Sequence, residues 1–216
     1  MLTYIVIELK DVDKQQMIKT VSDSQEEILL NIRKLHCNDV FDADLTYGNG
    51  VFWKNIGSPA FCCDISPVAG TAVLQADSTN VPVIDGAFNS VVFDPPFLTY
   101  IKQGRDSGSI MGKRFSGYWS YDELADHYSK TIDECHRILK KKGILVFKCQ
   151  DIVHNHKLHP THMYITNWAT KSGFRLKDMF ILTAKNRIPV RAAKHGIQTQ
   201  KHARIHHSYF LVLEKL

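Results

Sequence analysis

The sequence contains no hydrophobic run that approaches the roughly 20 residues needed to cross a bilayer. Its first residues, MLTYIVIELKDVDK, place no basic segment before the apolar one and include acids, which argues against a secretory signal peptide. With 44% hydrophobic and 23% charged residues, the composition is that of an ordinary globular protein. We therefore predict one domain over residues 1–216, located in the cytoplasm and without membrane contact.

Cysteine is too scarce and too irregularly spaced for a disulfide framework or a zinc site. The cysteines are odd in number and form no CxxC pair: Cys37, Cys62, Cys63, Cys135 and Cys149. Buried free thiols in a reducing compartment are the expected state. Histidines gather in the stretch His154–His162, but Pro160 breaks any helical spacing among them. We predict a solvated loop there and no metal site.

Acidic residues are absent from the segment 185–207, which is rich in lysine, arginine and histidine. The net charge of the chain is only +5, so this local excess favours a polyanionic partner more than the global value does. The alternative is a solvated basic face. A second irregular segment, 98–119, contains glycines and basic residues. A loop of that length is typical of a mobile lid that contacts substrate.

Strand-like and helix-like stretches alternate along the chain. Helical spacing of apolar residues predicts helices over Ser24–Leu35, Tyr121–Leu139 and Thr161–Ser172. Apolar runs with little alternation predict buried strands over Val40–Leu45, Ala60–Asp64, Thr71–Gln75, Ser90–Phe93, Gly143–Cys149, Phe174–Leu182 and Tyr209–Glu214. This order predicts an α/β fold, an open, doubly wound and mostly parallel sheet with helices on both faces. The last two strands, joined without a helix, are expected to pair antiparallel at one edge.

A glycine turn, Asp44-Leu45-Thr46-Tyr47-Gly48-Asn49-Gly50, follows a buried strand. Glycines one residue apart let the backbone turn sharply and approach a ligand closely. In open α/β sheets such a turn lies at the carboxyl end of a strand, where cofactors bind. The dinucleotide motif G-x-G-x-x-G is not matched, because Trp53 stands at the position of its third glycine.

Carboxylates end the next two strands. Asp64, followed by Ile65, is placed to accept hydrogen bonds from the two hydroxyls of a ribose. Asp77, followed by Ser78, could accept one from the amino group of an adenine. Each acid could instead cap a loop. Together with the glycine turn, however, they form a cofactor-binding series in the expected order.

The residues Asp94-Pro95-Pro96-Phe97 end a further buried strand. Neither proline can donate to the sheet, so the strand must stop there. Because proline fixes φ, the Asp94 carboxylate and the Pro95 carbonyl become two acceptors on a stiff turn, suited to the two N–H groups of an amine. Phe97 adds an aromatic face on which a planar base could stack.

These motifs resemble the amino-methyltransferases of nucleic acids, the N6-adenine and N4-cytosine DNA methylases. The hallmark of that family is Asp, Asn or Ser followed by Pro-Pro and an aromatic residue. The resemblance runs from about residue 39 to the end of the chain. It implies a class I methyltransferase fold with an antiparallel edge strand at the C-terminus, and S-adenosyl-L-methionine as the cofactor. It places catalysis at Asp94, Pro95, Pro96 and Phe97, and the cofactor at Asp44, Thr46, Tyr47, Gly48, Gly50, Asp64, Ile65, Asp77, Ser78 and Asp94.

The resemblance further implies direct in-line methyl transfer to the amino group of a DNA base, adenine N6 first and cytosine N4 second, with the base flipped out of the duplex. One alternative is an RNA amino-methyltransferase acting on adenine N6 or guanine N2. Another, of a different class, is a nucleic-acid-binding subunit without catalysis. A protein-glutamine methyltransferase fits less well, since that family resembles Asn-Pro-Pro-Tyr and Asp94 departs from it.

Unlike sequence-specific DNA methylases, the chain shows no separate target-recognition domain. Only the two irregular segments and Phe97 are available to contact DNA or RNA, so specificity is short or lax, or a partner or second subunit supplies it. The basic residues expected to contact substrate are Lys102, Arg105, Lys113, Arg114, Arg187, Arg191 and Lys201.

Overall fold

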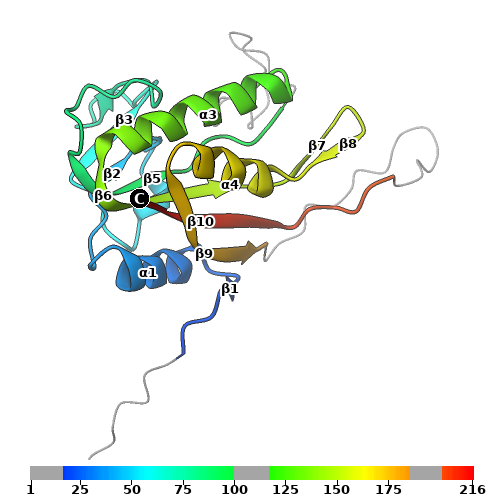
Figure 1. Ribbon diagram of the computed structural model, residues 1–216, viewed down its shortest axis with the longest axis horizontal. Helices are drawn as coiled ribbons and strands as arrows, with labels where there is room; N and C mark the ends of the chain where they lie inside the picture. The colour runs from blue at the N-terminus through cyan, green and yellow to red at the C-terminus, as the bar shows by residue number, and fades with distance from the viewer. Residues whose placement is uncertain (1–16, 100–116, 185–200) are drawn as a thin grey trace, which may run out of the picture.

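The structure, a computed structural model, describes residues 17–99, 117–184 and 201–216, which surround one central sheet (Figure 1). The sheet has eight strands, which are β1 (Val21–Ser22), β2 (Ala43–Asp44), β3 (Phe61–Asp64), β4 (Leu74–Gln75), β5 (Phe88–Phe93), β6 (Leu139–Cys149), β9 (Phe174–Thr183) and β10 (His207–Lys215). The helices are α1 (Gln25–His36), α3 (Tyr121–Ile138), α4 (Thr161–Lys171) and the short 3-10 helix η1 (Val51–Trp53). The alternation of strands and helices predicted from the sequence is confirmed.

The strands lie in the order β1-β9-β10-β6-β5-β2-β3-β4. The five strands from β6 to β4 run parallel to one another. Their carboxyl ends therefore meet at one edge of the sheet, which is where open α/β sheets bind ligands. We call this the carboxyl edge.

The last strand, β10, occupies a different place from the one predicted. It does pair antiparallel with β9, as expected, but it also pairs antiparallel with β6, so it lies inside the sheet. The outer strands on that side are β9 and then β1. The physical reason is the burial of residues 208–214 on both faces, since a buried strand needs a hydrogen-bonding partner on each side.

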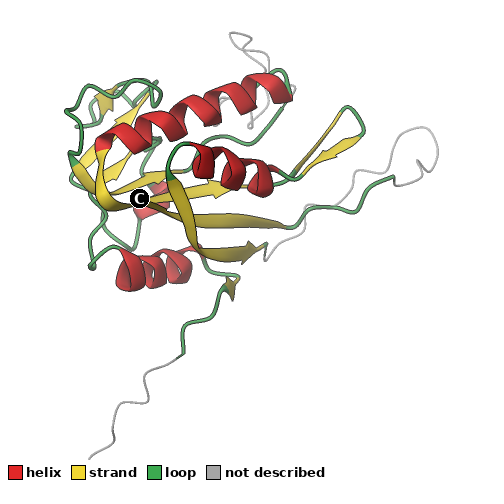
Figure 2. Cartoon of the chain, in the orientation of Figure 1, coloured by secondary structure: helices red, strands yellow, loops and turns green. Residues whose placement is uncertain are grey.

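Two apolar cores lie on opposite faces of the sheet, as Figure 2 shows by the helices on either side. On one face α3 and α4 pack against the strands, with Leu124 fully buried. On the other face α1 packs through Ile28. Successive residues of β5 divide between the cores, Val91 and Phe93 toward α3 and Val92 toward α1, because side chains alternate along a strand. The doubly wound prediction is confirmed.

The helix starts follow from capping residues. The hydroxyl of Ser24 accepts a hydrogen bond from the backbone N–H of Glu27 at 3.2 Å, which begins α1. Ser120 caps α3 in the same way, accepting from the N–H of Glu123 at 3.2 Å. Both caps satisfy a backbone donor that no helical carbonyl can reach. The observed helices therefore begin and end within one or two residues of the predicted bounds.

The histidine-rich stretch forms a hairpin rather than the predicted solvated loop. Its strands β7 (Ile152–His154) and β8 (Lys157–His159) pair antiparallel around Asn155 and His156. Both turn residues have positive φ, 48° and 59°, as a two-residue hairpin turn requires. His154 is buried, and its ring Nδ1 lies 3.1 Å from the hydroxyl of Thr99.

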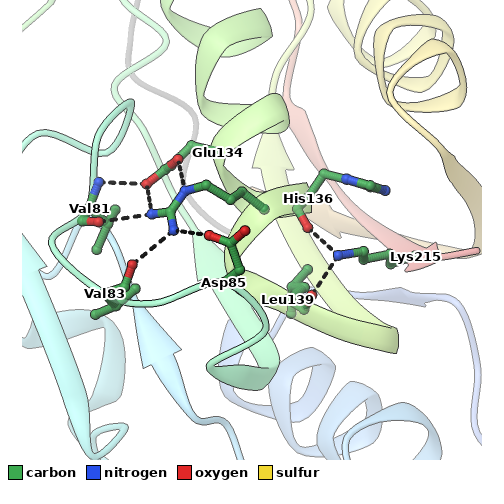
Figure 3. A network of polar contacts seen from close by, with 8 residues as sticks. Val81, Val83, Asp85, Glu134, His136, Leu139 and Lys215 are labelled. Carbon is green, nitrogen blue, oxygen red and sulfur yellow. Dashed lines mark hydrogen bonds and ion pairs between the residues drawn. The ribbon is translucent and has the colours of Figure 1, made fainter.

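A polar network ties α3 to the loop that leads into β5 (Figure 3). Arg137 donates to both oxygens of the buried Glu134, at 2.8 and 2.6 Å. It also donates to the carbonyls of Val81 and Val83 and to the carboxylate of Asp85. The loop ahead of the Asp94 strand is therefore held to the helix by several bonds from one side chain.

Every cysteine has a free thiol, and all but Cys62 are buried. Burial raises the pKa of Cys37 and of Cys63 to about 12, which makes these thiols inert. Within residues 17–99, 117–184 and 201–216, no group of three or more His, Cys, Asp or Glu side chains is placed to hold a metal ion. The same residues contain no helix long and apolar enough to cross a membrane.

Candidate active site

Three of the predicted acids come together at the carboxyl edge of the sheet. Asp44 ends β2 and Asp64 ends β3, while Asp94 directly follows β5. Strand β2 lies between the other two and pairs parallel with both. The parallel arrangement therefore brings together three side chains that are far apart in the sequence.

The side chain of Asp44 is buried and holds the glycine turn through hydrogen bonds. One carboxylate oxygen accepts from the ring N–H of Trp53 at 2.6 Å, and the other accepts from the backbone N–H of Thr46 at 2.8 Å. Only 2% of Asp44 is exposed. Burial raises the pKa of its carboxyl to about 7, although the hydrogen bonds from Thr46 and Trp53 oppose the shift. Asp44 thus shapes the turn, and Trp53 is its buried partner.

The turn itself is fixed to the neighbouring strand. The backbone N–H of Gly48 donates to Asp64 at 2.9 Å, and the N–H of Ser66 donates to the other oxygen of Asp64 at 2.8 Å. Gly50 has a φ of +74°, and a Cβ added there would lie 2.7 Å from the hydroxyl of Tyr47. The side chain of Ile65, next to Asp64, is 61% exposed. An acid and an apolar side chain thus border a glycine turn in which a side chain at Gly50 would meet the ring of Tyr47.

Asp77 and Ser78 differ in exposure to solvent. Asp77 is exposed, and the backbone N–H and hydroxyl of Thr79, which donate to it, lower the pKa of its carboxyl. Ser78 is buried, and its hydroxyl lies 2.9 Å from the ring of His127 and 3.1 Å from the hydroxyl of Thr131. Asp77 is therefore open to a ligand, whereas Ser78 fastens the loop to α3.

The Asp94–Phe97 turn is held at both ends. The backbone N–H of Asp94 donates to the hydroxyl of Thr46 at 2.8 Å, which joins this motif to the glycine turn. The hydroxyl of Tyr128 on α3 donates to the Pro96 carbonyl at 3.0 Å. Among the described residues, none donates a hydrogen bond to the Pro95 carbonyl. That oxygen and the Asp94 carboxylate remain as acceptors on a braced turn.

Lys148, near the end of β6, is a site residue that the sequence analysis missed. Its ammonium group lies 3.1 Å from the carboxylate of Asp94 and donates to the amide oxygen of Gln25 at 2.9 Å. It also lies over the rings of Phe52 and Phe210, at 5.2 and 5.6 Å from their centres. A lysine at the end of an otherwise apolar strand, Ile-Leu-Val-Phe-Lys-Cys, was the available signal.

Lys148 bears directly on the charge of Asp94. Burial raises the pKa of the Asp94 carboxyl, and the neighbouring Lys148 opposes that shift by charge and by hydrogen bonding. Asp44 adds a like charge nearby, since Asp94 in turn raises the pKa of Asp44. Lys148 is therefore the group at this edge that favours the ionised form of Asp94.

A pocket of about 610 Å³ opens beside the Asp94–Lys148 pair. It is bordered by the start of α1, the end of β6 and the chain that enters β10. The lining includes Gln25, Phe97, Lys148, Arg204, His206 and His207. The pocket combines an aromatic ring with cationic side chains, which suits a planar ligand that carries negative charge.

The predicted substrate residues are mostly not within the described part of the chain. Lys102, Arg105, Lys113 and Arg114 fall in one gap, and Arg187 and Arg191 fall in the other. Lys201 is described and exposed. Of the two irregular segments, the structure therefore covers only 98–99, 117–119 and 201–207.

The residues at the carboxyl edge have the chemistry to hold a nucleoside cofactor. Gly48 and Gly50 have positive φ, +57° and +74°, so the backbone turns sharply at the end of β2. Asp64 and Asp77 offer carboxylate oxygens at successive strand ends. Each oxygen of Asp64 accepts one hydrogen bond and keeps a lone pair, whereas one oxygen of Asp77 accepts both bonds from Thr79 and the other accepts none from the described residues. The set therefore fits a ligand with ribose hydroxyls and an adenine amino group.

The comparison with known families then decides the class. The family model described as DNA methylase, for N6 and N4 methyltransferases, matches residues 88–215, which include Asp94–Phe97 and Lys148. The chain belongs to the DNA methylase family. Enzymes of this family take their methyl group from S-adenosylmethionine. The matched range excludes the glycine turn, Asp64 and Asp77, whose assignment rests on their position alone.

Solved structures place the fold among class I methyltransferases. The 1,6-didemethyltoxoflavin-N1-methyltransferase of Burkholderia thailandensis is 10% identical, with a TM-score of 0.51 over 89% of this chain and 79% of that one. A provisionally named DNA modification methylase of Thermus thermophilus is 23% identical, with a TM-score of 0.44 over 65% of this chain and 52% of that one. The chain thus spans about half the length of that methylase. No curated protein matches the chain.

Proposed function

We propose that this chain transfers a methyl group from S-adenosylmethionine to the exocyclic amino group of a base in DNA, adenine N6 first and cytosine N4 second. The observation that carries the proposal is the braced turn after β5, where the Asp94 carboxylate and the Pro95 carbonyl stand as acceptors beside a pocket. The Asp-Pro-Pro-Phe form of the turn favours adenine. The DNA methylase family match over this turn supports the chemistry.

The Asp94 carboxylate and the Pro95 carbonyl increase the nucleophilicity of the target amine in this proposal. An exocyclic amine is a poor nucleophile, because its lone pair is conjugated with the ring. When Asp94 and the Pro95 carbonyl each accept one N–H, the nitrogen becomes more tetrahedral and its lone pair is directed away from the ring plane. The charge on Asp94 also stabilises the ammonium that develops on the nitrogen. Asp94 need not remove a proton before the attack, and the methylated ammonium then loses its proton to solvent.

Other residues of the chain hold the partners of this reaction. S-adenosylmethionine, when bound, would supply an electrophilic methyl group, and the breaking of its S–CH3 bond would leave S-adenosylhomocysteine. Asp64 accepts from ribose hydroxyls and Asp77 from the adenine amino group, and the backbone N–H of Gly48 in the glycine turn holds Asp64 in place. The hydroxyl of Thr46 accepts a hydrogen bond from the N–H of Asp94, which fixes the glycine turn to the catalytic turn. Phe97 stacks on the target base, which leaves the duplex to reach it.

The whole chain acts as one catalytic domain in this proposal. Apart from the β7–β8 hairpin, the described strands share one sheet with a core on each face, and none of the described elements forms a second unit for target recognition. Recognition then falls to the segments 98–119 and 185–207, or to a partner or second subunit.

The direct test incubates the protein with methyl-labelled cofactor and unmethylated genomic DNA, followed by mass spectrometry of the nucleosides. We expect N6-methyladenine in the DNA. N4-methylcytosine would retain the chemistry and change the base. Label in transfer or ribosomal RNA with none in DNA would overturn the substrate assignment, and label in neither would leave a binding subunit.

The role of Asp94 is tested by Asp94→Ala. We expect methyl transfer to fall by about a hundred-fold to a thousand-fold, as when one preorganised polar contact to a transition state is removed. Cofactor affinity measured by calorimetry should stay close to that of the wild type. The matched control is Asp126→Ala, an exposed acid on α3 that pairs with Lys130 on the surface. Near-normal turnover in Asp94→Ala would refute the assignment of the catalytic turn.

A further inference from the structure

The β7–β8 hairpin projects from the carboxyl edge of the sheet, beyond the start of α4 (Figure 1). It begins shortly after β6, whose last residues include Lys148. A two-stranded hairpin is only marginally stable by itself, so its position depends on contacts with the rest of the molecule. Exposed residues at its tip include His156 and Lys157.

Contacts from three parts of the chain hold this hairpin. The ring of His154 lies 3.1 Å from the hydroxyl of Thr99, two residues after Phe97. The ring of His159 stacks on Tyr121, the first residue of α3, with ring centres 3.8 Å apart. The hairpin is therefore fastened to the segment that leaves the catalytic turn and to the helix that covers it.

The third contact joins the hairpin to the basic segment that precedes β10. The ring Nε2 of His202 lies 2.9 Å from the backbone carbonyl of His156. Exposed Lys157 on the hairpin thus lies on the same side of the molecule as exposed Lys201 and Arg204. Arg204 also lines the pocket that Phe97 and Lys148 border. We call these three exposed cations, Lys157, Lys201 and Arg204, the basic strip.

Within the described part of the chain, few acids lie near these cations. Asp151 is bound to the ring of His162 at 2.7 Å, and its side chain is only 13% exposed. Burial lowers the pKa of His159. The nearby Lys157 and His154 lower it further, whereas Asp122 raises it. Asp23 also lines the pocket. The strip is therefore positively charged at neutral pH, with Lys157, Lys201 and Arg204 as its cations.

We propose that the β7–β8 hairpin and residues 201–207 form one docking surface for the phosphate backbone of duplex DNA. The inference rests on the proposed function, and it names how the duplex is held while a base enters the pocket. Lysine and arginine contacts to phosphate supply affinity and register without reading sequence. Such a surface explains how a chain with no separate recognition unit can hold its substrate beside Asp94.

The test compares Lys157→Gln/Lys201→Gln with a matched control, Lys140→Gln/Lys141→Gln. The control lysines are exposed at the start of β6, at the opposite edge of the sheet and outside the proposed sites. Binding of a fluorescent duplex is measured over a range of salt concentrations. We expect the hairpin variant to bind about ten-fold more weakly at low salt. The slope of log affinity against log salt should fall by about two, since each of the two lysines no longer neutralises a phosphate. The control should change neither quantity.

Two further measurements keep this test independent of folding and catalysis. The thermal midpoint and the affinity for S-adenosylmethionine should match the wild type in both variants. At saturating DNA, turnover of the hairpin variant should return to within about two-fold of the wild type, because docking raises affinity and leaves the reacting groups unchanged.

The outcomes separate this inference from the proposed function. Equal affinity and salt slope in the two variants, with normal methyl transfer by the wild type, would overturn the docking surface alone. Salt-dependent duplex binding through the hairpin with no transfer by the wild type would overturn the proposed function alone. Weaker binding of structured RNA by the hairpin variant, with no duplex binding by the wild type, would overturn DNA as the occupant.

Discussion

Lys148 lies between three elements that the sequence keeps far apart. Its ammonium group touches Asp94 after β5 and Gln25 on α1, and it lies over the ring of Phe210 in β10. Its side chain is only 11% exposed, so its charge is poorly screened. Since Lys148 reaches the proposed substrate through Asp94, we regard it as a positioning residue.

Replacing Lys148 by methionine should move the pH dependence of methyl transfer. Without the cation, burial acts unopposed on Asp94 and the pKa of its carboxyl rises further. Because the ionised form is the active one, activity should be lost at a higher pH than in the wild type as the solution is acidified. At neutral pH we expect turnover to fall by about ten-fold to a hundred-fold. The measurement is kcat against pH at saturating DNA and cofactor.

The conservative variant Lys148→Arg distinguishes charge from packing. Arginine keeps a positive charge beside Asp94, so the acid limb of the profile should return toward that of the wild type. A methionine variant with reduced turnover and an unshifted profile would contradict the role proposed for the charge of Lys148.

At the scale of residues, motifs of neighbouring residues can be predicted from the sequence, whereas contacts between distant residues cannot. Asp94–Phe97 could be predicted because the proline geometry and the acceptors lie in neighbouring positions. The pairing of Lys148 with Asp94 could not be predicted, since the two residues lie 54 positions apart in the sequence. The pair exists because Phe93 faces Phe147 in the register of β5 and β6, and that register follows from packing across the sheet.

The glycine turn between β2 and β3 is the element on which the cofactor assignment depends. Gly50 and Gly57 both have positive φ, +74° and +87°, so an alanine at either site should cost about 1 kcal/mol of stability. Only at Gly50 would the new Cβ meet another group, the hydroxyl of Tyr47. Gly50→Ala should therefore also weaken S-adenosylmethionine binding, by about ten-fold or more. Calorimetric titration of each variant checks this.

Gly57→Ala serves as the control, since a Cβ at that position meets nothing within 4 Å. Its cofactor affinity should equal that of the wild type. If the two variants bind the cofactor equally well, the turn is not part of the cofactor site, whatever the fate of Asp94.

Elements were predictable where local signals and the global fold agree. The helices follow from serine caps and apolar spacing, and both signals are local. The hairpin was wrongly predicted as a loop because its polar composition conceals the alternation of buried Ile152 and His154 with half-buried Val153. The position of His154 depends on Thr99, a contact that only the folded chain supplies.

For the molecule as a whole, the Arg137 network is a stability device remote from the carboxyl edge. Arg137→Met would leave Glu134, which is only 8% exposed, without its cationic partner. The backbone N–H of Val81 would remain bonded to Glu134, so the destabilisation should be partial, about 2 kcal/mol. For a chain of this size, that lowers the thermal midpoint by roughly 4–8 °C.

Thermal unfolding followed by circular dichroism measures this shift. The control is Lys130→Met, whose salt bridge with Asp126 is more than half exposed on both sides and should contribute less than about 1 kcal/mol. Transfer activity of Arg137→Met at room temperature should remain close to normal. Equal midpoints for the two variants would show that the network does not stabilise the fold.

The central sheet can be completed only after strand β10 has been synthesised. It bonds to β6 on one side and β9 on the other, and within the described sheet it alone connects β1 and β9 to the remaining strands. During synthesis the ribosome makes both halves of the sheet before it makes the strand that joins them. Until residues 207–215 leave the exit tunnel, one edge of the largely buried strand β6 lacks its hydrogen-bonding partner. An unpaired strand edge of this kind is a surface that chaperones cover.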